Sequence, residues 1–509
     1  MSPPVSPVSV TRRAFLRAAT AGGAALAGFS LRERSASARA FGAPPDGYES
    51  FQLAPALRVK RVLEVFYFGG LSHYESFFCV PDYGAADATQ WNAFLASGQL
   101  QAAVDSCAFS GAPALLQPFG QDEGGASVSL GPFAMPLRER PDLTARMRIC
   151  VTAHGIEPHE AAVPLAISGR ALGHPALAGL GTHVERFKRE AGKGASSAPN
   201  AWVLSPSASI LGELTQAATS TGLHPSASRP IGVKIDAAGD FAKLLSRGTV
   251  GDARQRHDAV VQASIDRYRS RLTWKTTPLR AQRLDELGSA ASTMSHADVL
   301  QGLLSAELLA PLAGASCGAS ATVDATTMSL RLAAHLLTDP TNPATYISVF
   351  DGGFLPTKDA GGYDSHSDNC MVQGRNLTSS LRALASIINA PGEGNPGKLD
   401  LDDTLIILNT EFGRSPDVQG MNGRGHWPYG YPVVYLGGPI RSPGISGAIG
   451  PDARSTSAAT PSEHRVAALD ALGIWPFASE SFNVSDVQGV STEHAALASI
   501  HARIFGASS

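Results

Sequence analysis

The sequence predicts an α/β fold with a doubly wound, mostly parallel sheet and a helical insertion. Runs of consecutive apolar residues recur along the chain, as expected for strands that are buried on both faces. Helical patterns lie between these runs, and strands that alternate with helices favour parallel pairing. A chain of 509 residues with 43% apolar residues is also large enough to bury such a sheet.

The expected strands are rich in β-branched or aromatic residues, as in RVLEVFYF, and most show no alternation of apolar and polar positions. They cover 61–68, 147–153, 231–235, 345–350, 404–409 and 432–436. The expected helices cover about 174–191, 208–219, 323–338, 371–390 and 462–473. The segment 237–312 is charged and helix-forming with no strand pattern. We expect it to pack over the sheet as the helical insertion.

The first 40 residues resemble a twin-arginine export signal. The pair Arg12–Arg13 precedes an Ala- and Gly-rich apolar stretch, and Ala38 and Ala40 form an A-x-A cleavage pattern. That stretch is too short for an ordinary membrane span. The alternative is a chance arginine pair before a surface helix. We expect removal of residues 1–40, export of the mature chain 41–509 to the periplasm or beyond, and no membrane span in that chain.

Charge and cysteine content narrow the classes of function. The formal net charge is −3 and no basic stripe recurs, which argues against a nucleic-acid-binding protein. The five cysteines are widely spaced and contain no C-x-x-C pair. An oxidising compartment would permit one or two disulfides and leave at least one further thiol. The pairing cannot be derived from the sequence, although Cys150, in the apolar run RICVTA, is expected in the core.

Polar and charged residues follow directly on four of the expected strands. In chain order they are Ser72, His73 and Glu75; His154; Asp364 and His366; and Glu411, Arg414, Arg424 and His426. In open α/β sheets, ligands bind beyond the carboxyl ends of the strands. Carboxylate and imidazole ligands suit Zn²⁺, or Mn²⁺ and Mg²⁺ where oxygen ligands dominate. A metal there could polarise a phosphoryl or sulfuryl oxygen.

Each of these residues also has a structural alternative. The alternatives are loop hydrogen bonds for His73 and His154, an Asx turn at Asp364 and His366, an ion pair of Glu411 with Arg414, and packing of Arg424 and His426 against Trp427. Purely structural roles at all four strand ends are less favoured than a shared site. A right-handed crossover through the helix at 371–390 would make the strands 345–350 and 404–409 parallel neighbours.

Five sequence blocks occur in order across residues 61–475: GGLSHYESF, GGYDSH, LNTEFGRSP, GRGHWPYGYPVVYLGGPI and TPSEHRVAALDALGI. Together they resemble the exported bacterial domain of unknown function 1501 family, which is similar in fold to the sulfatase and alkaline-phosphatase superfamily. The resemblance implies an alkaline-phosphatase-like sheet. It also implies a metal-dependent hydrolase of phosphate or related esters.

The sequence departs from the family pattern at two positions, because the family usually has Asp where Glu75 and Gly425 stand. Glycine cannot ligate a metal through a side chain, so we expect a weakened site. The stretch CVPDY has the cysteine and proline of the sulfatase C-x-P-x-R pattern, but Tyr83 replaces its arginine. We therefore reject a formylglycine sulfatase. Ser72 follows a glycine pair and is a weak candidate nucleophile.

Two functional hypotheses stay open at this point. One is a metal-dependent hydrolase of a small anionic substrate, and the other is a non-catalytic binding or assembly protein of the cell envelope. The candidate metal ligands are Asp364, His366, His426 and Glu411. The other expected cleft residues are His73, Glu75, His154, Arg414 and Arg424, and the two arginines would attract an anionic ligand or orient the carboxylates.

Overall fold

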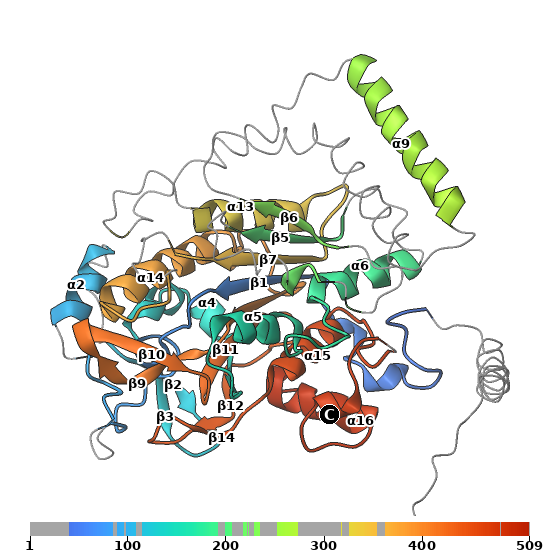
Figure 1. Ribbon diagram of the computed structural model, residues 1–509. Helices are drawn as coiled ribbons and strands as arrows, with labels where there is room; N and C mark the ends of the chain where they lie inside the picture. Colours follow the sequence, from blue (N-terminus) through green and yellow to red (C-terminus); the bar gives the residue numbers. More distant parts are fainter. Residues whose placement is uncertain are drawn as a thin grey trace, which may run out of the picture.

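A mixed eight-stranded sheet lies at the centre of the computed structural model (Figure 1). The strand order is β12-β4-β11-β8-β1-β7-β5-β6. The strands are β1 (Arg61–Tyr67), β4 (Met147–Thr152), β5 (Ala201–Ser205), β6 (Ile231–Lys234), β7 (Tyr346–Asp351), β8 (Thr404–Thr410), β11 (Tyr431–Gly437) and β12 (Gly444–Ser446). The structure describes residues 40–84, 89–95, 98–107, 115–191, 199–205, 217–220, 222, 229–234, 252–272, 317, 325–353, 362–478 and 480–507.

The sheet is mostly parallel, which confirms the predicted class. Strand β1 pairs in parallel with β7 and β8, and β5 pairs in parallel with β6 and β7. Strand β11 runs antiparallel to both of its neighbours, β4 and β8. The predicted direct pairing of β7 with β8 is wrong, because β1 lies between them and pairs with both. Both strands still end at the same edge of the sheet.

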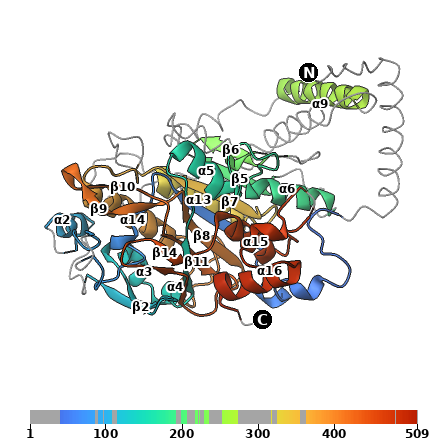
Figure 2. The ribbon, with the colours of Figure 1, turned by 60° about the horizontal axis from the view of Figure 1, so that its bottom comes forward.

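Helices cover both faces of the sheet, because successive strand residues point to opposite sides. Leu63, Val65 and Ile406 belong to a core cluster that includes residues of α13 (Ala325–Thr338) and α14 (Asn369–Ser386). Val62 and Leu405 belong to another cluster, on the face covered by α6 (Leu180–Glu190), α15 (Pro461–Ala471) and α16 (Glu493–Ile500). Figure 2 shows α15 and α16 side by side on that face. The doubly wound arrangement is thus present.

All six predicted strands are found, but several elements were not predicted. Strands β5 and β12, with sequences AWVLS and GIS, are short, and α5 (His159–Ser168) contains Pro164. The predicted helix at 208–219 lies almost wholly outside the described residues. Of the predicted insertion at 237–312, the structure describes α9 (Asp252–Leu272), which stands apart from the helices that cover the sheet (Figure 1).

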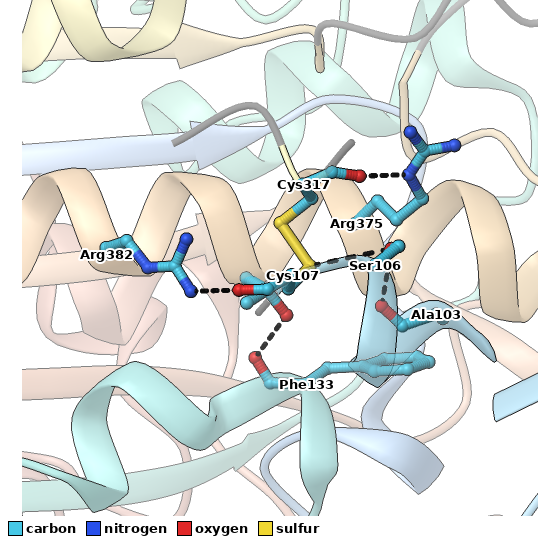
Figure 3. Close-up of a disulfide and its surroundings, with 8 residues drawn as sticks. Ala103, Ser106, Cys107, Phe133, Cys317, Arg375 and Arg382 are labelled. Carbon is cyan, nitrogen blue, oxygen red and sulfur yellow. Dashed lines mark hydrogen bonds between the residues drawn. A yellow bond between two sulfur atoms is a disulfide. The ribbon is translucent and has the colours of Figure 1, made fainter. Parts of the chain in front are cut away.

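A disulfide between Cys107 and Cys317 joins two distant parts of the chain, while Cys79, Cys150 and Cys370 are buried and form no disulfide within the described residues. Cys107 directly follows α2 (Gly98–Ser106). Arg382 and Arg375 of α14 donate hydrogen bonds to the carbonyl oxygens of Cys107 and Cys317, at 2.6 Å and 2.8 Å (Figure 3). The disulfide is therefore fastened to α14.

Residues 1–39, which hold the expected export signal, lie outside the described part of the chain. Within the described part, the search for membrane-spanning helices found none with sufficient length and apolar character.

Candidate metal centre

The candidate site is formed by loops that leave the carboxyl ends of neighbouring strands. Asp364 and His366 lie in the loop between β7 and α14, and His159 is the first residue of α5, which follows β4. His426 lies in β10 (Gly423–Trp427), which pairs with β9 (Gly413–Gln419) in a hairpin between β8 and β11. Because β4, β7 and β8 point in one direction, their loops meet at one edge.

Three imidazole Nε2 atoms surround the carboxylate of Asp364. Its Oδ1 lies 3.1 Å from His366 Nε2 and 3.3 Å from His426 Nε2, and its Oδ2 lies 3.5 Å from His159 Nε2. The Nε2 atoms of His366 and His426 are 3.1 Å apart. Tetrahedral metal–ligand bonds of about 2.0–2.1 Å would place neighbouring donor atoms about 3.3–3.4 Å apart. The donor spacing therefore fits a divalent metal ion.

His159, Asp364 and His426 are three residues of this cluster whose ligand atoms could together hold a metal ion. Their ligand atoms all lie within 4.8 Å of one another. His159 Nε2 is buried, and its contact with Asp364 Oδ2, at 3.5 Å, is longer than an ordinary hydrogen bond. A metal ion held by these two atoms would satisfy both of them.

His159 and His426 each have an acceptor oxygen beside the other ring nitrogen. Glu411 Oε1 lies 2.9 Å from His159 Nδ1, and the Glu157 carbonyl oxygen lies 3.1 Å from His426 Nδ1. Because a carbonyl or ionised carboxylate oxygen can only accept, both Nδ1 atoms can donate a hydrogen bond. Loss of any hydrogen from Nε2 would then leave both Nε2 lone pairs free to face a metal. Metal-binding histidines are oriented in this way by outer partners.

Arg414 fixes the carboxylate of Asp364. It is fully buried, and its Nη2 donates to Asp364 Oδ1 at 2.5 Å and also to the Gly69 carbonyl oxygen. Burial alone would raise the pKa of Asp364, but hydrogen bonds from His159 and His426 and the charge of Arg414 lower it well below its usual range. Asp364 is consequently an anion at neutral pH.

His159 carries a proton in the absence of a metal. Burial lowers its pKa, but hydrogen bonds to Asp364 and Glu411, together with their negative charges, raise the net pKa to about 9. A cationic imidazole between two carboxylates balances their charge. A metal ion that took this position would have to displace the proton.

The family model that describes a protein of unknown function, DUF1501, matches residues 59–471. The chain belongs to the DUF1501 family. The matched region includes all the residues of the cluster. Searches of curated proteins and of solved structures found no match.

In this DUF1501 protein, two predicted residues support the cluster from outside. Glu411 holds His159 and also accepts a hydrogen bond from the Gly69 amide at 2.7 Å. Gly69 has φ +114°, and a Cβ there would lie 2.1 Å from the Asp364 amide nitrogen, so only glycine allows this approach. His154 Nε2 lies 2.7 Å from the Glu411 carbonyl oxygen, and burial lowers the pKa of His154. His154 thus positions the Glu411 backbone.

Both predicted arginines of the DUF1501 chain are buried and committed to partners within the protein. Arg424 is paired with Glu75 at 2.8 Å, both fully buried, and it also donates to the carbonyl oxygens of Ser415 and Pro416. Of the two roles expected for Arg424, this contact matches the orienting of a carboxylate, that of Glu75, and not the attraction of an anionic ligand. Arg414 is likewise committed to backbone carbonyls and Asp364, so it orients a carboxylate and does not face a ligand.

Ser72 and His73 do not reach the cluster either. The Ser72 hydroxyl is fully buried and donates to Glu75, a position that a substrate could not reach as a nucleophile. His73 is fully buried among the rings of Tyr74 and Trp91, and burial together with the charge of Arg424 lowers its pKa to about 3. Glu75, Ser72 and His73 thus belong to the interior of this DUF1501 fold.

Gly425 lies behind His366 rather than at the metal-facing atoms. A Cβ at position 425 would lie 2.5 Å from the side-chain amide nitrogen of Gln419, and Gln419 Oε1 lies 3.4 Å from His366 Nδ1. A side chain at 425 would therefore adjoin Gln419, the residue beside His366 Nδ1. The sequence interpretation, in which Gly425 removes a ligand, stays a prediction.

Two residues of the site were missed from the sequence. His159 is not among the expected cleft residues, although it lies five positions after His154, which is. The signal for His159 is its place immediately after Pro158, at the start of a helix that begins at the sheet edge. Gln419 carries no recognisable signal, since its contact with His366 depends on how the β9–β10 hairpin folds back.

Proposed function

We propose that this DUF1501 protein is an exported metal-dependent hydrolase of phosphate or related esters. The observation that carries the proposal is the convergence of the Nε2 atoms of His159, His366 and His426 on the Asp364 carboxylate. The cluster lies at the carboxyl edge of a mostly parallel sheet, and this edge is where open α/β enzymes bind their substrates. We also propose that the sheet is of the alkaline-phosphatase-like type.

The donor set favours a transition metal over Mg²⁺. Imidazole nitrogen suits Zn²⁺ and related ions, whereas Mg²⁺ prefers an octahedral shell of oxygen ligands. We therefore propose Zn²⁺ first and Mn²⁺ second. A divalent cation supplies Lewis-acid chemistry, because it polarises an ester oxygen and makes a water molecule more acidic.

The chain's own residues would perform three tasks in this reaction. Asp364 and the imidazoles bind the cation, and Arg414 keeps Asp364 ionised and oriented. Glu411 and the Glu157 carbonyl keep the Nδ1 protons of His159 and His426 in place, so that the Nε2 atoms stay available. The Ser72 hydroxyl has no role in this scheme, which needs water as the nucleophile.

Two features support the proposed export. The N-terminal sequence has the twin-arginine pattern, and Cys107 and Cys317 form a disulfide. Disulfides persist in oxidising compartments and are rare in the cytosol of most organisms. Both features fit a protein that works in the periplasm or outside the cell.

The proposal is tested on the mature chain, residues 41–509, after removal of metal by a chelator. Binding of Zn²⁺, Mn²⁺ and Mg²⁺ is measured by calorimetry, and hydrolysis of p-nitrophenyl phosphate, bis(p-nitrophenyl) phosphate and p-nitrophenyl sulfate is then followed in the loaded protein. Asp364→Asn should abolish both signals. Asp368→Asn is the matched control, because Asp368 is exposed and its left-handed backbone (φ +47°) is one that asparagine tolerates.

A second candidate function is non-catalytic binding or assembly in the cell envelope. It is favoured by the burial of Arg414 and Arg424, which leaves both predicted cations unable to contact an anionic substrate. Under this hypothesis the protein would bind a metal and hydrolyse none of the esters. Absence of stoichiometric metal binding by the wild-type protein would contradict the first proposal.

A further inference from the structure

The three histidines of the cluster differ in how strongly their rings are fixed by secondary structure and by the contacts of Nδ1. His159 stands at the start of a helix, and its Nδ1 contacts the fully buried Glu411 at 2.9 Å. His426 lies in a paired strand, and its Nδ1 contacts a backbone carbonyl at 3.1 Å. The side chains of both are about one-fifth exposed, at 20% and 21%. Both are therefore set by regular structure and by partners at normal hydrogen-bond distance.

His366 differs from the other two histidines in each respect. It lies in a loop rather than in a helix or strand, and its side chain is 37% exposed. Its Nδ1 partner is the amide oxygen of Gln419, an exposed side chain, at 3.4 Å. This distance exceeds the usual range of about 2.7–3.2 Å for an N–H···O hydrogen bond. Its ring is held least firmly of the three.

We propose that His366 is an exchangeable fourth ligand, which a small anion or the anionic group of an ester replaces at the metal. The proposal rests on the proposed function, because it presupposes that the cluster binds a metal. His159, Asp364 and His426 would remain as the permanent set, because their ligand atoms lie within 4.8 Å of one another and both histidines belong to regular structure. Because its ring is the most exposed of the three, departure of His366 would open the coordination sphere toward solvent.

This exchange bears on whether the site can turn over substrate. Structural zinc sites are closed by four protein ligands, whereas catalytic sites keep one position for water or substrate. A fixed His366 would close the site, and a displaceable His366 would open it only when a competing ligand arrives. The incoming ligand would thus be a compact anion that can coordinate a metal.

The test uses Co²⁺ as a spectroscopic substitute and azide as the probe anion. The proteins are the mature wild type, His366→Ala, His426→Ala, Gln419→Glu and a matched histidine control, His494→Ala. His494 is an exposed residue that stacks on Phe51, away from the cluster. Visible absorption reports the number of ligands on Co²⁺, and titrations give the dissociation constants of Co²⁺ and azide.

His366→Ala should keep its Co²⁺, with a loss of affinity no greater than about 10- to 100-fold, the range for outer-shell partners of a metal site. Its spectrum should change, and it should bind azide more tightly than the wild type. His426→Ala should lose more metal affinity than this. Gln419→Glu should hold His366 more firmly and weaken azide binding, since a carboxylate is the stronger acceptor.

Two results would overturn the proposal while leaving the metal site intact. If His366→Ala loses Co²⁺ as completely as His426→Ala, then His366 is a permanent ligand. If its spectrum and azide affinity equal those of His494→Ala, then His366 is not a ligand. A wild-type protein that binds no Co²⁺ would overturn both this proposal and the proposed function.

Discussion

Glu411 and His159 form a buried carboxylate–imidazole pair, in which the Glu411 Oε1 and the His159 Nδ1 are 2.9 Å apart. The pair joins the end of β8 to the start of α5 and leaves the other ring nitrogen facing Asp364. Since the acceptor on Nδ1 sets both the orientation and the basicity of the ring, Glu411 can influence the site without touching a metal.

Glu411→Gln should therefore weaken Zn²⁺ binding by about 10- to 100-fold. The amide keeps the size of the carboxylate but removes its charge, so the ring becomes a poorer ligand. Calorimetric titration of metal-free protein measures the change. Glu160→Gln is the control, because Glu160 is the exposed neighbour of His159. Equal affinities in the two variants would exclude this role for Glu411.

Metal affinity should increase with pH and level off near pH 9. The pKa of His159 is raised from 6.5 to about 9, so below pH 9 a metal must displace its proton. The apparent association constant should rise by up to about tenfold per pH unit in that range. Calorimetry in buffers of different ionisation enthalpy counts the protons released. Proton release that is absent at pH 7.5 would contradict the prediction.

The same protonation affects the stability of the metal-free protein. His159 has a higher pKa in the folded state than in the unfolded state, so its contribution is fully present below pH 6.5 and is lost as the pH rises through about 9. The urea midpoint of metal-free wild-type protein should fall across this interval. His159→Gln should show a smaller fall.

Gly425→Asp should raise metal affinity by strengthening the support of His366. The new carboxylate would displace the flexible end of Gln419, which lies 2.5 Å from the added Cβ. Gly425→Ala is the matched control, since it adds the Cβ without the charge. We expect the aspartate variant to bind Zn²⁺ more tightly than the alanine variant. If the two bind equally, the carboxylate has no effect on the site.

The buried ion pair between Glu64 of β1 and Arg465 of α15 should be sensitive to substitution. Both side chains are 1% exposed and lie 2.8 Å apart, and Tyr346 and Asn409 also donate to Glu64. Arg465→Met leaves a buried carboxylate without its counter-charge and should lower the free energy of unfolding by about 3–5 kcal/mol. Urea denaturation measures this loss.

The control for that substitution is the surface pair of Lys60 and Asp403, in which Lys60 is 76% exposed. Lys60→Ala should cost at most about 1 kcal/mol, because solvent screens an exposed pair. A similar cost for Arg465→Met would show that the Glu64 pair contributes little.

Export should depend on the arginine pair at the N-terminus. Replacement of Arg12 and Arg13 by lysine should leave the full-length precursor in the cytoplasm. Fractionation followed by immunoblotting measures its location, and processed protein in the periplasm after this substitution would contradict the prediction. Lysine substitution at Arg32 and Arg34 is the matched control, because it makes the same two changes in the N-terminal segment outside the arginine pair.

Most of the central sheet could be predicted because its strands are long apolar runs. The strands β1, β4 and β8 each contain consecutive large hydrophobic residues that have no role except burial. Strand β12 has only three residues, too few to show a pattern, and the places of β5 and β12 in the sheet depend on pairing with distant segments. Sequence patterns also could not show that β1 separates β7 from β8, because strand order depends on long-range packing.

The candidate site was predictable in its location but less so in its members. Carboxylates and imidazoles after strand ends correctly indicated Asp364, His366, Glu411 and His426, which the structure brings together. The same reasoning failed for Arg424 and Glu75, because a buried ion pair and a ligand-binding pair use the same residue types. A structural ion pair is distinguished from a ligand-binding pair only by the surrounding packing, which here buries the side chains of Arg424 and Glu75 completely.

The antiparallel strand β11 has a mechanical consequence for the edge of the sheet. The hairpin β9–β10 begins where β8 ends and leads back into β11, and β8 and β11 are direct neighbours. The two ends of the hairpin are therefore continuous with two strands that are hydrogen-bonded to each other. Rotation of the hairpin as a rigid unit would break some of these hydrogen bonds. His426 is therefore held in place by paired strands, whereas His366, in the described segment 362–368 before α14, belongs to no helix or strand.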